Sequence, residues 1–281
     1  MAQREAYPRQ VMGIVNCTPD SFYTGSGELP NRAQLRATLL RHLAEGANWL
    51  DLGAMSTRPG AEEVPVEEEW SRLKEGLEAV EELRREGRLT ARVSVDTFRV
   101  EVARRAIETY GVAMINDITG GQYDEQMYRL VGDTGVQYVA MHMRGTPQTM
   151  QQLTHYDDVV EEVRSWLLER VERMVAEGVQ PGQIWLDPGF GFAKNLEQEY
   201  HLVAGLKRMT EAGFPLLVGI SRKSMLTRVA GITKEEALPA TTALHWELLR
   251  QGATMLRVHD VAAARQTVDL YNYYEQTALQ R

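Results

Sequence analysis

Residues 92–117 read RVSVDTFRVEVARRAIETYGVAMIND, and this stretch decides the fold. Two short, mostly apolar segments, 92–96 and 113–117, flank a segment at 100–110 whose pattern is helical. Near-continuous apolar runs are typical of strands buried on both faces of a parallel sheet, and parallel neighbours need a crossover connection between them. The stretch is therefore expected to form a strand–helix–strand unit.

The same alternation of strand and helix continues along the chain. Eight segments are expected to be strands, at residues 11–16, 49–54, 92–96, 113–117, 137–142, 184–187, 216–220 and 255–259. Helical patterns lie at 32–45, 66–83, 100–110, 125–132, 159–174, 200–209, 234–251 and 262–275. Eight such units in about 250–280 residues match a (β/α)₈ barrel. An open doubly wound sheet is the alternative, but no strand is followed by the glycine fingerprint of dinucleotide binding.

The chain contains neither a Pro/Gly-rich linker nor a low-complexity segment at which it would divide into two parts. Its strand–helix rhythm also continues without a change in composition. We therefore expect an α/β protein that consists of a single (β/α)₈ TIM barrel. This one domain would occupy residues 1–281, with its core at about 10–275.

The composition is that of an ordinary globular protein, with 43% hydrophobic and 25% charged residues. No apolar run approaches the roughly 18–20 residues that span a bilayer, and the N-terminal MAQREAYPRQ lacks the apolar segment of a signal peptide. For want of such a run we expect no membrane partner, and because the net charge is −8 we expect no nucleic-acid partner. The single cysteine, Cys17, cannot form an internal disulfide, which fits a cytoplasmic protein in a reducing environment. We expect Cys17 to be a small buried residue.

Polar side chains recur at the C-terminal ends of these strands. They are Asn16, Asp51, Asp96, Asn116, Asp117, His142, Asp187, Ser221, Arg222, Lys223, Arg257, His259 and Asp260. Taken alone, an Asp or Asn here would cap a helix or order a turn, and His142 would be a satisfied core histidine. Active sites of (β/α)₈ barrels form at this end of the strands, so the recurrence favours a site for a polar, partly anionic ligand.

The residue types at this rim indicate the chemistry of the ligand. Four potential cations lie there: Arg58, Lys223, Arg257 and His259. Together with hydroxyl groups and helix N-termini they can hold phosphate groups. Asp96, Asn116 and Asp187 suit a planar heterocycle with adjacent N–H donors and a carbonyl. Asn16 can supply an oxygen ligand to Mg²⁺, which binds mainly through waters and substrate phosphates.

Eight ordered sequence blocks carry these residues. The blocks are NCTPDSF at 16–22, STRPG at 56–60, SVDT at 94–97, IND at 115–117, MHMRGTP at 141–147, LDPGFGF at 186–192, SRKS at 221–224 and RVHD at 257–260. In sequence and order this set resembles the dihydropteroate synthases, a folate-pathway family inhibited by sulfonamides. One departure is Met55, where many members of the family have a glutamate. We expect this change to affect local loop packing more than activity.

The resemblance implies an enzyme that joins 6-hydroxymethyl-7,8-dihydropterin diphosphate to p-aminobenzoate, giving 7,8-dihydropteroate and diphosphate. The implied pterin contacts are Asp96, Asn116, Met141, Asp187 and Lys223. The implied diphosphate contacts are Thr57, Arg58, Arg257, His259 and, through Mg²⁺, Asn16. The implied p-aminobenzoate pocket consists of Phe22, Arg58, Pro59, Phe190 and Ser224. A homodimer is implied as well, although the apolar residues of the last two helices could also pack within one chain.

The chemistry favours a dissociative, S_N1-like substitution with Asp20, Arg58 and Lys223 as catalytic residues. The departing diphosphate needs its growing charge stabilised by cations and Mg²⁺, and the pterin ring shares the positive charge left behind. Two alternatives stay open. A pterin-dependent methyltransferase that transfers to cobalamin would have no need of the anion-binding residues, and a catalytically silent pterin-binding protein would be expected to have lost some of them.

Overall fold

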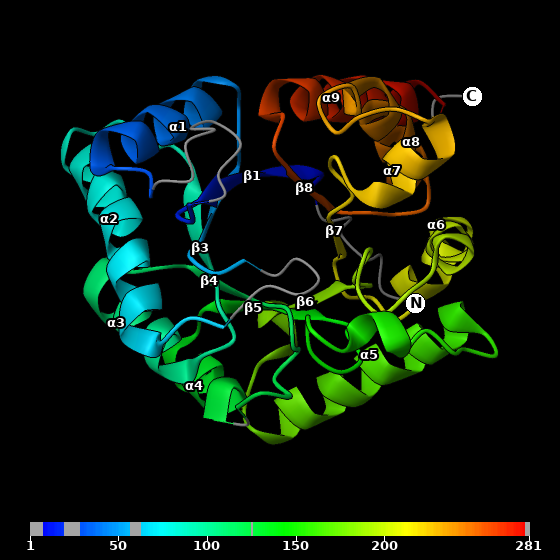
Figure 1. The fold of residues 1–281 in the computed structure, drawn as a ribbon, viewed down its shortest axis with the longest axis horizontal. Helices are drawn as coiled ribbons and strands as arrows, with labels where there is room; N and C mark the ends of the chain where they lie inside the picture. The colour runs from blue at the N-terminus through cyan, green and yellow to red at the C-terminus, as the bar shows by residue number, and fades with distance from the viewer. Residues whose placement is uncertain (1–7, 20–28, 57–62, 125, 279–281) are drawn as a thin grey trace.

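Eight parallel strands form the centre of the computed structural model, which describes residues 8–19, 29–56, 63–124 and 126–278 (Figure 1). The strands are β1 (Gln10–Asn16), β2 (Trp49–Gly53), β3 (Arg92–Asp96), β4 (Met114–Asp117), β5 (Gln137–Met141), β6 (Ile184–Asp187), β7 (Leu217–Val218) and β8 (Met255–Val258). Their order in the sheet is β6-β5-β4-β3-β2-β1-β8-β7. A parallel bridge between Leu186 and Leu216 brings the two outer strands together, so the sheet closes into the expected barrel.

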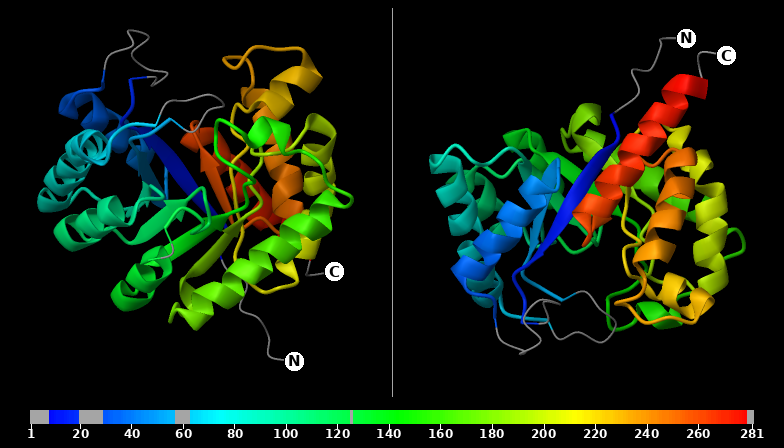
Figure 2. Two further views of the ribbon diagram at one scale, coloured as in Figure 1. Left: turned by 60° about the horizontal axis from the view of Figure 1, so that its bottom comes forward. Right: turned by 90° about the horizontal axis from the view of Figure 1, so that it is seen from above.

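The helices form a ring around this barrel (Figure 1). They are α1 (Arg32–Ala44), α2 (Val66–Arg85), α3 (Val100–Tyr110), α4 (Gln126–Thr134), α5 (Val159–Ala176), α6 (Leu196–Thr210), α7 (Ser224–Ala230), α8 (Leu238–Arg250) and α9 (Val261–Ala278). Two 3₁₀ turns, η1 (Met150–Gln152) and η2 (Pro181–Gln183), precede α5 and β6, respectively. The last helix, α9, lies alongside the first strand, β1 (Figure 2). Within the described residues, no helix is both long and apolar enough to cross a membrane.

Local sequence sets several of the helix ends. The Asn31 side chain accepts a hydrogen bond from the Gln34 backbone, and the Gln34 side chain accepts one from the Asn31 backbone, which begins α1 with a reciprocal cap. Asn195 and Gln198 repeat this arrangement at the start of α6. At the other end of α3, Gly111 adopts the left-handed conformation that glycine favours.

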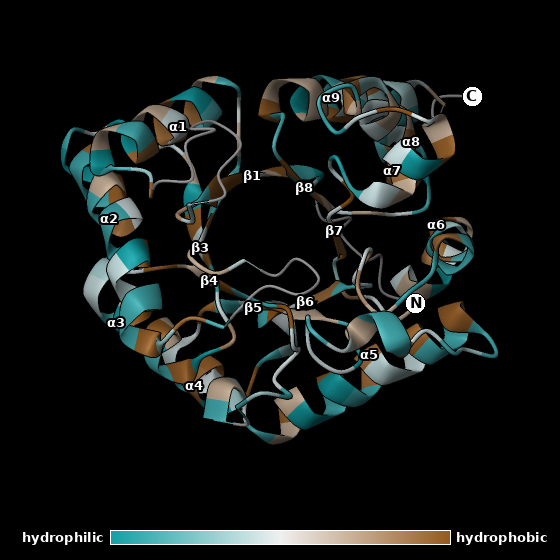
Figure 3. Cartoon of the chain, viewed as in Figure 1, coloured by the Kyte–Doolittle hydropathy of each residue, from teal (hydrophilic) through white to brown (hydrophobic). Residues whose placement is uncertain are grey.

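Successive residues of each strand face alternately toward the helices and toward the barrel interior. Outward-facing residues, such as Leu50 and Leu52 of β2, pack in the main core with the apolar faces of the helices, whose outer surfaces are hydrophilic (Figure 3). The inward-facing residues of seven strands form a separate apolar cluster: Met12, Trp49, Met114, Val139, Trp185, Leu217 and Met255. The barrel is therefore filled by side chains near the beginnings of its strands.

The structure differs most from the expected elements around β7 and at the starts of α6 and α8; α6 begins at Leu196, four residues before the expected 200. β7 covers only Leu217–Val218 instead of 216–220, because a hydrogen bond of 3.0 Å from the Lys223 backbone N–H to the Ile220 carbonyl turns the chain there. The following residues form the short helix α7, which the sequence pattern does not single out, and α8 begins four residues later than the expected 234. Pro239 lies in the first turn of α8, where its missing N–H has no helical partner to lose.

Candidate active site

A layer of polar side chains lies directly above the apolar interior cluster. Asp51, Asn116, Asp187 and Arg257 each follow, two positions along the same strand, an apolar member of that cluster. Residues two apart on a strand face the same side, so these groups also point into the barrel. We call the following set the polar cup: Asp51, Asp96, Asn116, Asp187, Lys223 and Arg257. It lies at the C-terminal ends of the strands, where the sequence predicts the site.

The Arg257 guanidinium joins three strands across the polar cup. Its Nε donates a 2.7 Å hydrogen bond to Asp51 Oδ2, and its second terminal nitrogen donates one of 2.7 Å to Asp96 Oδ2. The Asn116 amide donates to the same Asp51 oxygen at 3.0 Å. Asp51 is fully buried, and its Oδ1 has no hydrogen-bond partner among the described residues. This one carboxylate therefore orients both the arginine and the asparagine.

Asp96 lies at the open end of β3 and is held on one side by Arg257. Burial raises the pKa of Asp96 to about 7, against the opposing effect of the Arg257 charge and with repulsion from Asp51. At neutral pH its carboxyl group is consequently poised between an acceptor form and a protonated form that can also donate.

Asp187 and Lys223 form the other half of the cup. The Gly189 backbone N–H donates a 2.7 Å hydrogen bond to Asp187 Oδ1, and the Lys223 ammonium donates to the Phe190 carbonyl. Burial raises the pKa of Asp187, while the nearby Lys223 charge opposes that effect. Burial also lowers the pKa of Lys223 to about 8, against the attraction of Asp187. The two groups are thus a buried acceptor and a buried donor on the same side of the cup.

His259 lies just beyond β8, beside the polar cup. Its Nδ1 is 3.1 Å from the Ser221 hydroxyl oxygen, and its backbone N–H donates to the same oxygen at 3.2 Å. Burial, together with the Arg257 charge, lowers the pKa of His259 to about 4. The expectation of a cation at this position is therefore corrected: the imidazole is neutral near pH 7, and which of its ring nitrogens donates a hydrogen bond depends on the tautomer.

An apolar wall borders the cup on the side of β3 to β5. Met141, at the end of β5, packs in a cluster with Phe98, Ile118, Met143, Met150 and Ala193. Met55 packs against this cluster, so the departure from the family motif adds to the wall. A cavity of about 300 Å³ lies beside it, lined by Met55, Ser56, Glu63, Phe98, Thr119, Gln122, Tyr123, Met143, Gly145, Thr146, Pro147 and Gln148. No residue of the polar cup lines this cavity, so it neighbours the cup without being part of it.

The remaining predicted site residues are placed less centrally. Asn16 ends β1 and is partly buried, and Ser224 begins α7 with an exposed side chain. Phe190 is fully buried, and it is its carbonyl group that contacts Lys223. The predicted residues Asp20, Phe22, Thr57, Arg58 and Pro59 lie outside the described residues.

The sequence by itself assigns no role to two important residues. Asp51 is among the polar strand ends expected at the rim but is given no contact of its own, and the structure places it at the centre of the cup. Its position two residues after the interior Trp49 is the signal that could have identified it. The second is Lys194, which is only 5% exposed and makes three hydrogen bonds. Nothing in the local sequence distinguishes this lysine from a solvated one.

Comparison with known proteins identifies the family. A family model described as pterin binding enzyme matches residues 12–259. A dihydropteroate synthase of Synechocystis sp. is 40% identical over 259 residues, covering 91% of this chain and 86% of that protein. The chain belongs to the dihydropteroate synthase family. It is accordingly an enzyme with dihydropteroate synthase function in folate synthesis.

Solved structures of dihydropteroate synthases share the barrel. The Xanthomonas albilineans enzyme with 4-aminobenzoic acid superposes with a TM-score of 0.85 at 39% identity, covering 95% of this chain and 93% of that one. A structure from the same organism in complex with 7,8-dihydropteroate gives a TM-score of 0.82 at 36% identity, covering 95% and 94% of the two chains. The similarity thus extends over almost the whole synthase, in sequence and in fold.

The donor set bears on whether this synthase can hold Mg²⁺. Among the described residues, no group of three or more His, Cys, Asp or Glu side chains is arranged to bind a metal ion. The end of β1 does offer the amide oxygen of Asn16. Mg²⁺ keeps several waters and binds through substrate phosphates, so one protein oxygen fits an ion that arrives with the diphosphate. The described residues do not fit a preformed all-protein cage.

Proposed function

We propose that this synthase binds the pterin ring of 6-hydroxymethyl-7,8-dihydropterin diphosphate in the polar cup. The observation that carries the proposal is the convergence of Asp96, Asn116, Asp187 and Lys223 at the C-terminal ends of the strands, above the apolar interior cluster. The carboxylates would accept hydrogen bonds from the adjacent N–H groups of the ring, and the Lys223 ammonium would donate to its carbonyl. Met141 would pack against one face, as is usual in largely apolar pockets with a few placed polar groups.

The diphosphate would lie at the rim, next to His259 and Arg257. Arg257 already faces two carboxylates, so its charge is largely balanced within the protein. Most of the positive charge for the leaving group must therefore come from elsewhere, and the predicted contributors are Arg58 and Mg²⁺ at Asn16, with Thr57 as a hydrogen-bond donor. When bound, Mg²⁺ would neutralise charge that develops on the departing phosphate oxygens.

The proposed reaction is an S_N1-like substitution. The bond between the exocyclic carbon and the diphosphate oxygen breaks first, the diphosphate leaves with the electron pair, and the pterin shares the remaining positive charge. The amine nitrogen of p-aminobenzoate then forms the new C–N bond and releases a proton. Asp20 would stabilise the cation, and Arg58 the leaving group, while Lys223 would hold the ring in place.

A diphosphate-release assay with the pterin diphosphate tests this proposal. Release is expected only when both p-aminobenzoate and Mg²⁺ are present, and Asp20→Ala and Arg58→Ala are expected to slow it while the fold stays intact. Binding of the pterin without release would support the silent pterin-binding protein. Methyl transfer from a methylated pterin to cobalamin would support the methyltransferase. Unchanged turnover in both variants would overturn the dissociative mechanism.

Two further proposals concern the second substrate and the assembly. The p-aminobenzoate pocket would be formed by the rim residues Phe22, Arg58, Pro59, Phe190 and Ser224, with the carboxylate of p-aminobenzoate near the start of α7.

A homodimer would use α9, on which Leu270 and Tyr273 are 65% and 72% exposed. Light scattering at micromolar concentration, compared between the wild type and Tyr273→Glu, tests the dimer: a monomeric wild type overturns it. The cytoplasmic location stays a prediction.

A further inference from the structure

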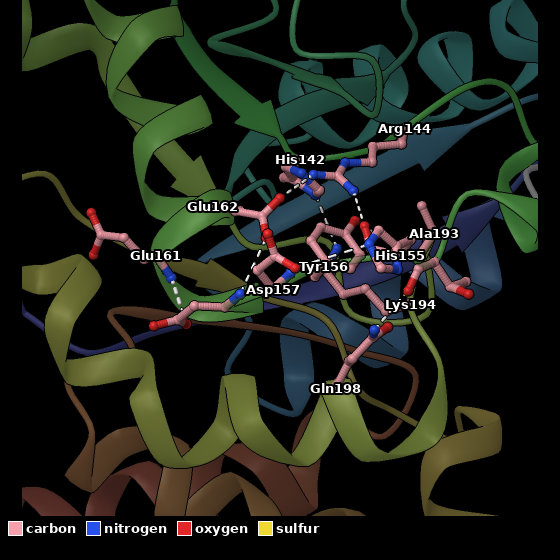
Figure 4. Close-up of polar contacts among 12 residues, drawn as sticks. His142, Arg144, His155, Tyr156, Asp157, Glu161, Glu162, Ala193, Lys194 and Gln198 are labelled. Atoms are coloured by element: carbon pink, nitrogen blue, oxygen red, sulfur yellow. Dashed lines mark hydrogen bonds and ion pairs between the residues drawn. The ribbon is translucent and has the colours of Figure 1, made fainter.

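A second lysine, Lys194, is buried behind the polar cup, in the loop between β6 and α6. Its ammonium group lies 3.0 Å from the Gly189 carbonyl and 2.9 Å from the Phe192 carbonyl. It also lies 3.0 Å from His142 Nδ1 (Figure 4). An ammonium has three N–H donors and no acceptor, so these three partners use all of them. The third bond requires a neutral His142 ring, and burial lowers the pKa of that imidazole well below its usual value.

These bonds enclose the segment that forms one side of the cup. The first acceptor, Gly189, also uses its N–H to hold Asp187 Oδ1 at 2.7 Å. Between the two carbonyl acceptors lies Phe190, whose own carbonyl receives the Lys223 hydrogen bond. The ring of Phe192 lies 5.0 Å from the Lys223 ammonium. Lys194 thus binds the loop on both sides of the Phe190 carbonyl, which accepts the hydrogen bond from Lys223, and at the residue whose N–H holds Asp187.

A neighbouring loop supports the same segment from outside. The Tyr156 hydroxyl donates a 3.0 Å hydrogen bond to the Ala193 carbonyl, next to Lys194. The Arg144 guanidinium lies 3.8 Å from the centre of the Tyr156 ring and forms a 2.7 Å ion pair with Glu162 on α5 (Figure 4). Ala193 has a φ of 51°, a left-handed conformation that is unfavourable for a residue with a Cβ. The loop is therefore held in a shape that its backbone would not adopt unaided.

Charge connects Lys194 to the cup as well. Burial lowers the pKa of Lys194 to about 7, and the Asp187 and Glu199 carboxylates oppose this, while Lys223 and Arg144 add to it. Asp187 in turn experiences the charges of both lysines. Loss of the Lys194 ammonium would consequently remove one of the two lysine charges near a buried carboxylate as well as three hydrogen bonds.

We propose that Lys194, together with Tyr156, is a positioning residue that fixes the β6–α6 loop and thereby holds Asp187 and Lys223 in register for the pterin ring. The inference rests on the proposed pterin-binding role of those two residues. Lys194 itself makes no contact with the ring in this arrangement, because its three donors all point to protein atoms behind the cup.

The test compares pterin binding by calorimetry, with pterin-6-carboxylate as the probe, in the wild type and in Lys194→Met. Methionine keeps the length and the apolar stem of lysine and removes the three donors. We expect the dissociation constant to rise roughly tenfold or more, since small misplacements of binding groups have effects of this size. Leu83→Ala, a buried core change near the end of α2, is the control for general destabilisation and is expected to bind like the wild type.

Chemical rescue separates positioning from packing. Lys194→Cys, combined with Cys17→Ala, is alkylated with bromoethylamine in denaturant and refolded, which restores an ammonium at the end of a side chain of lysine length. Pterin affinity within about threefold of the Cys17→Ala parent is expected after alkylation, and weak binding before it. If Lys194→Met does not fold, the inference is tested with Tyr156→Phe instead. That variant is expected to raise the dissociation constant for the pterin roughly threefold or more.

Each outcome bears on the inference. The inference is overturned if Lys194→Met binds pterin as tightly as the wild type or, where Lys194→Met does not fold, if Tyr156→Phe does. It is also overturned if Leu83→Ala weakens pterin binding equally, or if alkylation of the refolded Lys194→Cys protein does not restore binding. A wild type that does not bind pterin at all overturns the proposed function itself, which is a different result from a pterin-binding wild type with an unaffected variant.

Discussion

Arg257 on β8 donates a 2.7 Å hydrogen bond to Asp96 at the end of β3, although β1 and β2 lie between these strands in the sheet. Its Nε meanwhile binds Asp51 on β2. The guanidinium therefore crosses the mouth of the barrel and compensates two buried carboxylates at once. Because this one cation balances both carboxylates, the stability of the barrel and the shape of the cup depend on the same side chain.

Replacing Arg257 by methionine is expected to destabilise the protein in a pH-dependent way. At pH 8 the variant leaves Asp51 and Asp96 without their cation, and the free energy of unfolding should fall by about 3–5 kcal/mol. At pH 5 Asp96, whose pKa is about 7, is already protonated, so the difference from the wild type should shrink. Urea unfolding at both pH values measures this. A variant equally stable to the wild type at pH 8 would contradict the interpretation.

The pH dependence of kcat/KM for the pterin diphosphate is expected to be bell-shaped. Asp96 must be deprotonated to accept hydrogen bonds, so kcat/KM rises as the pH passes about 7. Lys223 must be protonated to donate, so kcat/KM falls as the pH passes about 8. The free-enzyme profile reports these groups, with values that belong to the coupled cup as a whole. A rate independent of pH between 6 and 9 would show that neither group titrates in the free enzyme.

Gly189→Ala is expected to be severely destabilising. A Cβ at this position would lie 2.0 Å from the His142 carbonyl oxygen, and the backbone has a φ of +69°. We expect a loss of about 4 kcal/mol or more, which belongs to the rare extreme of single substitutions. Thermal unfolding provides the measurement.

Gly111→Ala is the matched control for that substitution. Gly111 has a similar φ of +62° but nothing within 4 Å of the added Cβ. Only the conformational strain should remain, about 1–2 kcal/mol. Equal losses in the two variants would mean that the close approach to His142 contributes nothing.

Cys17 is expected to be unreactive in the folded enzyme. The thiol is 1% exposed, and burial raises its pKa to about 12. A thiol-specific chromogenic reagent at pH 8 should therefore label no cysteine in the native protein and one per chain in denaturing urea. Rapid labelling of the native protein would show that the end of β1 opens readily.

The fold could be predicted well because its signals are local. The bounds of β3, β6 and α3 agree with the sequence prediction, since apolar runs and helical spacing are visible within a few residues. The errors concern short elements: β7 has two residues, and α7 has too few turns to show a period. The expectation of a buried Cys17 is confirmed as well.

The sequence predicts which strand-end residues lie at the site, but not the hydrogen bonds and ion pairs that connect them. The sequence places Asp96, Asn116, Asp187, Lys223 and Arg257 at one rim, and the structure brings them together. Their roles as binding residues stay predictions. The sequence does not reveal that Asp51 is the common partner of Asn116 and Arg257, because that contact joins residues 206 positions apart. For the same reason it does not separate the buried Lys194, whose contact with His142 spans 52 positions, from an exposed lysine.

The position of Arg257 also has a consequence for how the enzyme is made. On the ribosome, β2 and β3 emerge long before β8, because Arg257 follows Asp96 by 161 residues. Until then, the growing polypeptide carries two carboxylates destined for an interior that still lacks their counter-charge. We therefore expect a chain that ends before β8 to lack a complete cup, and substrate binding to begin only after β8 pairs with β1.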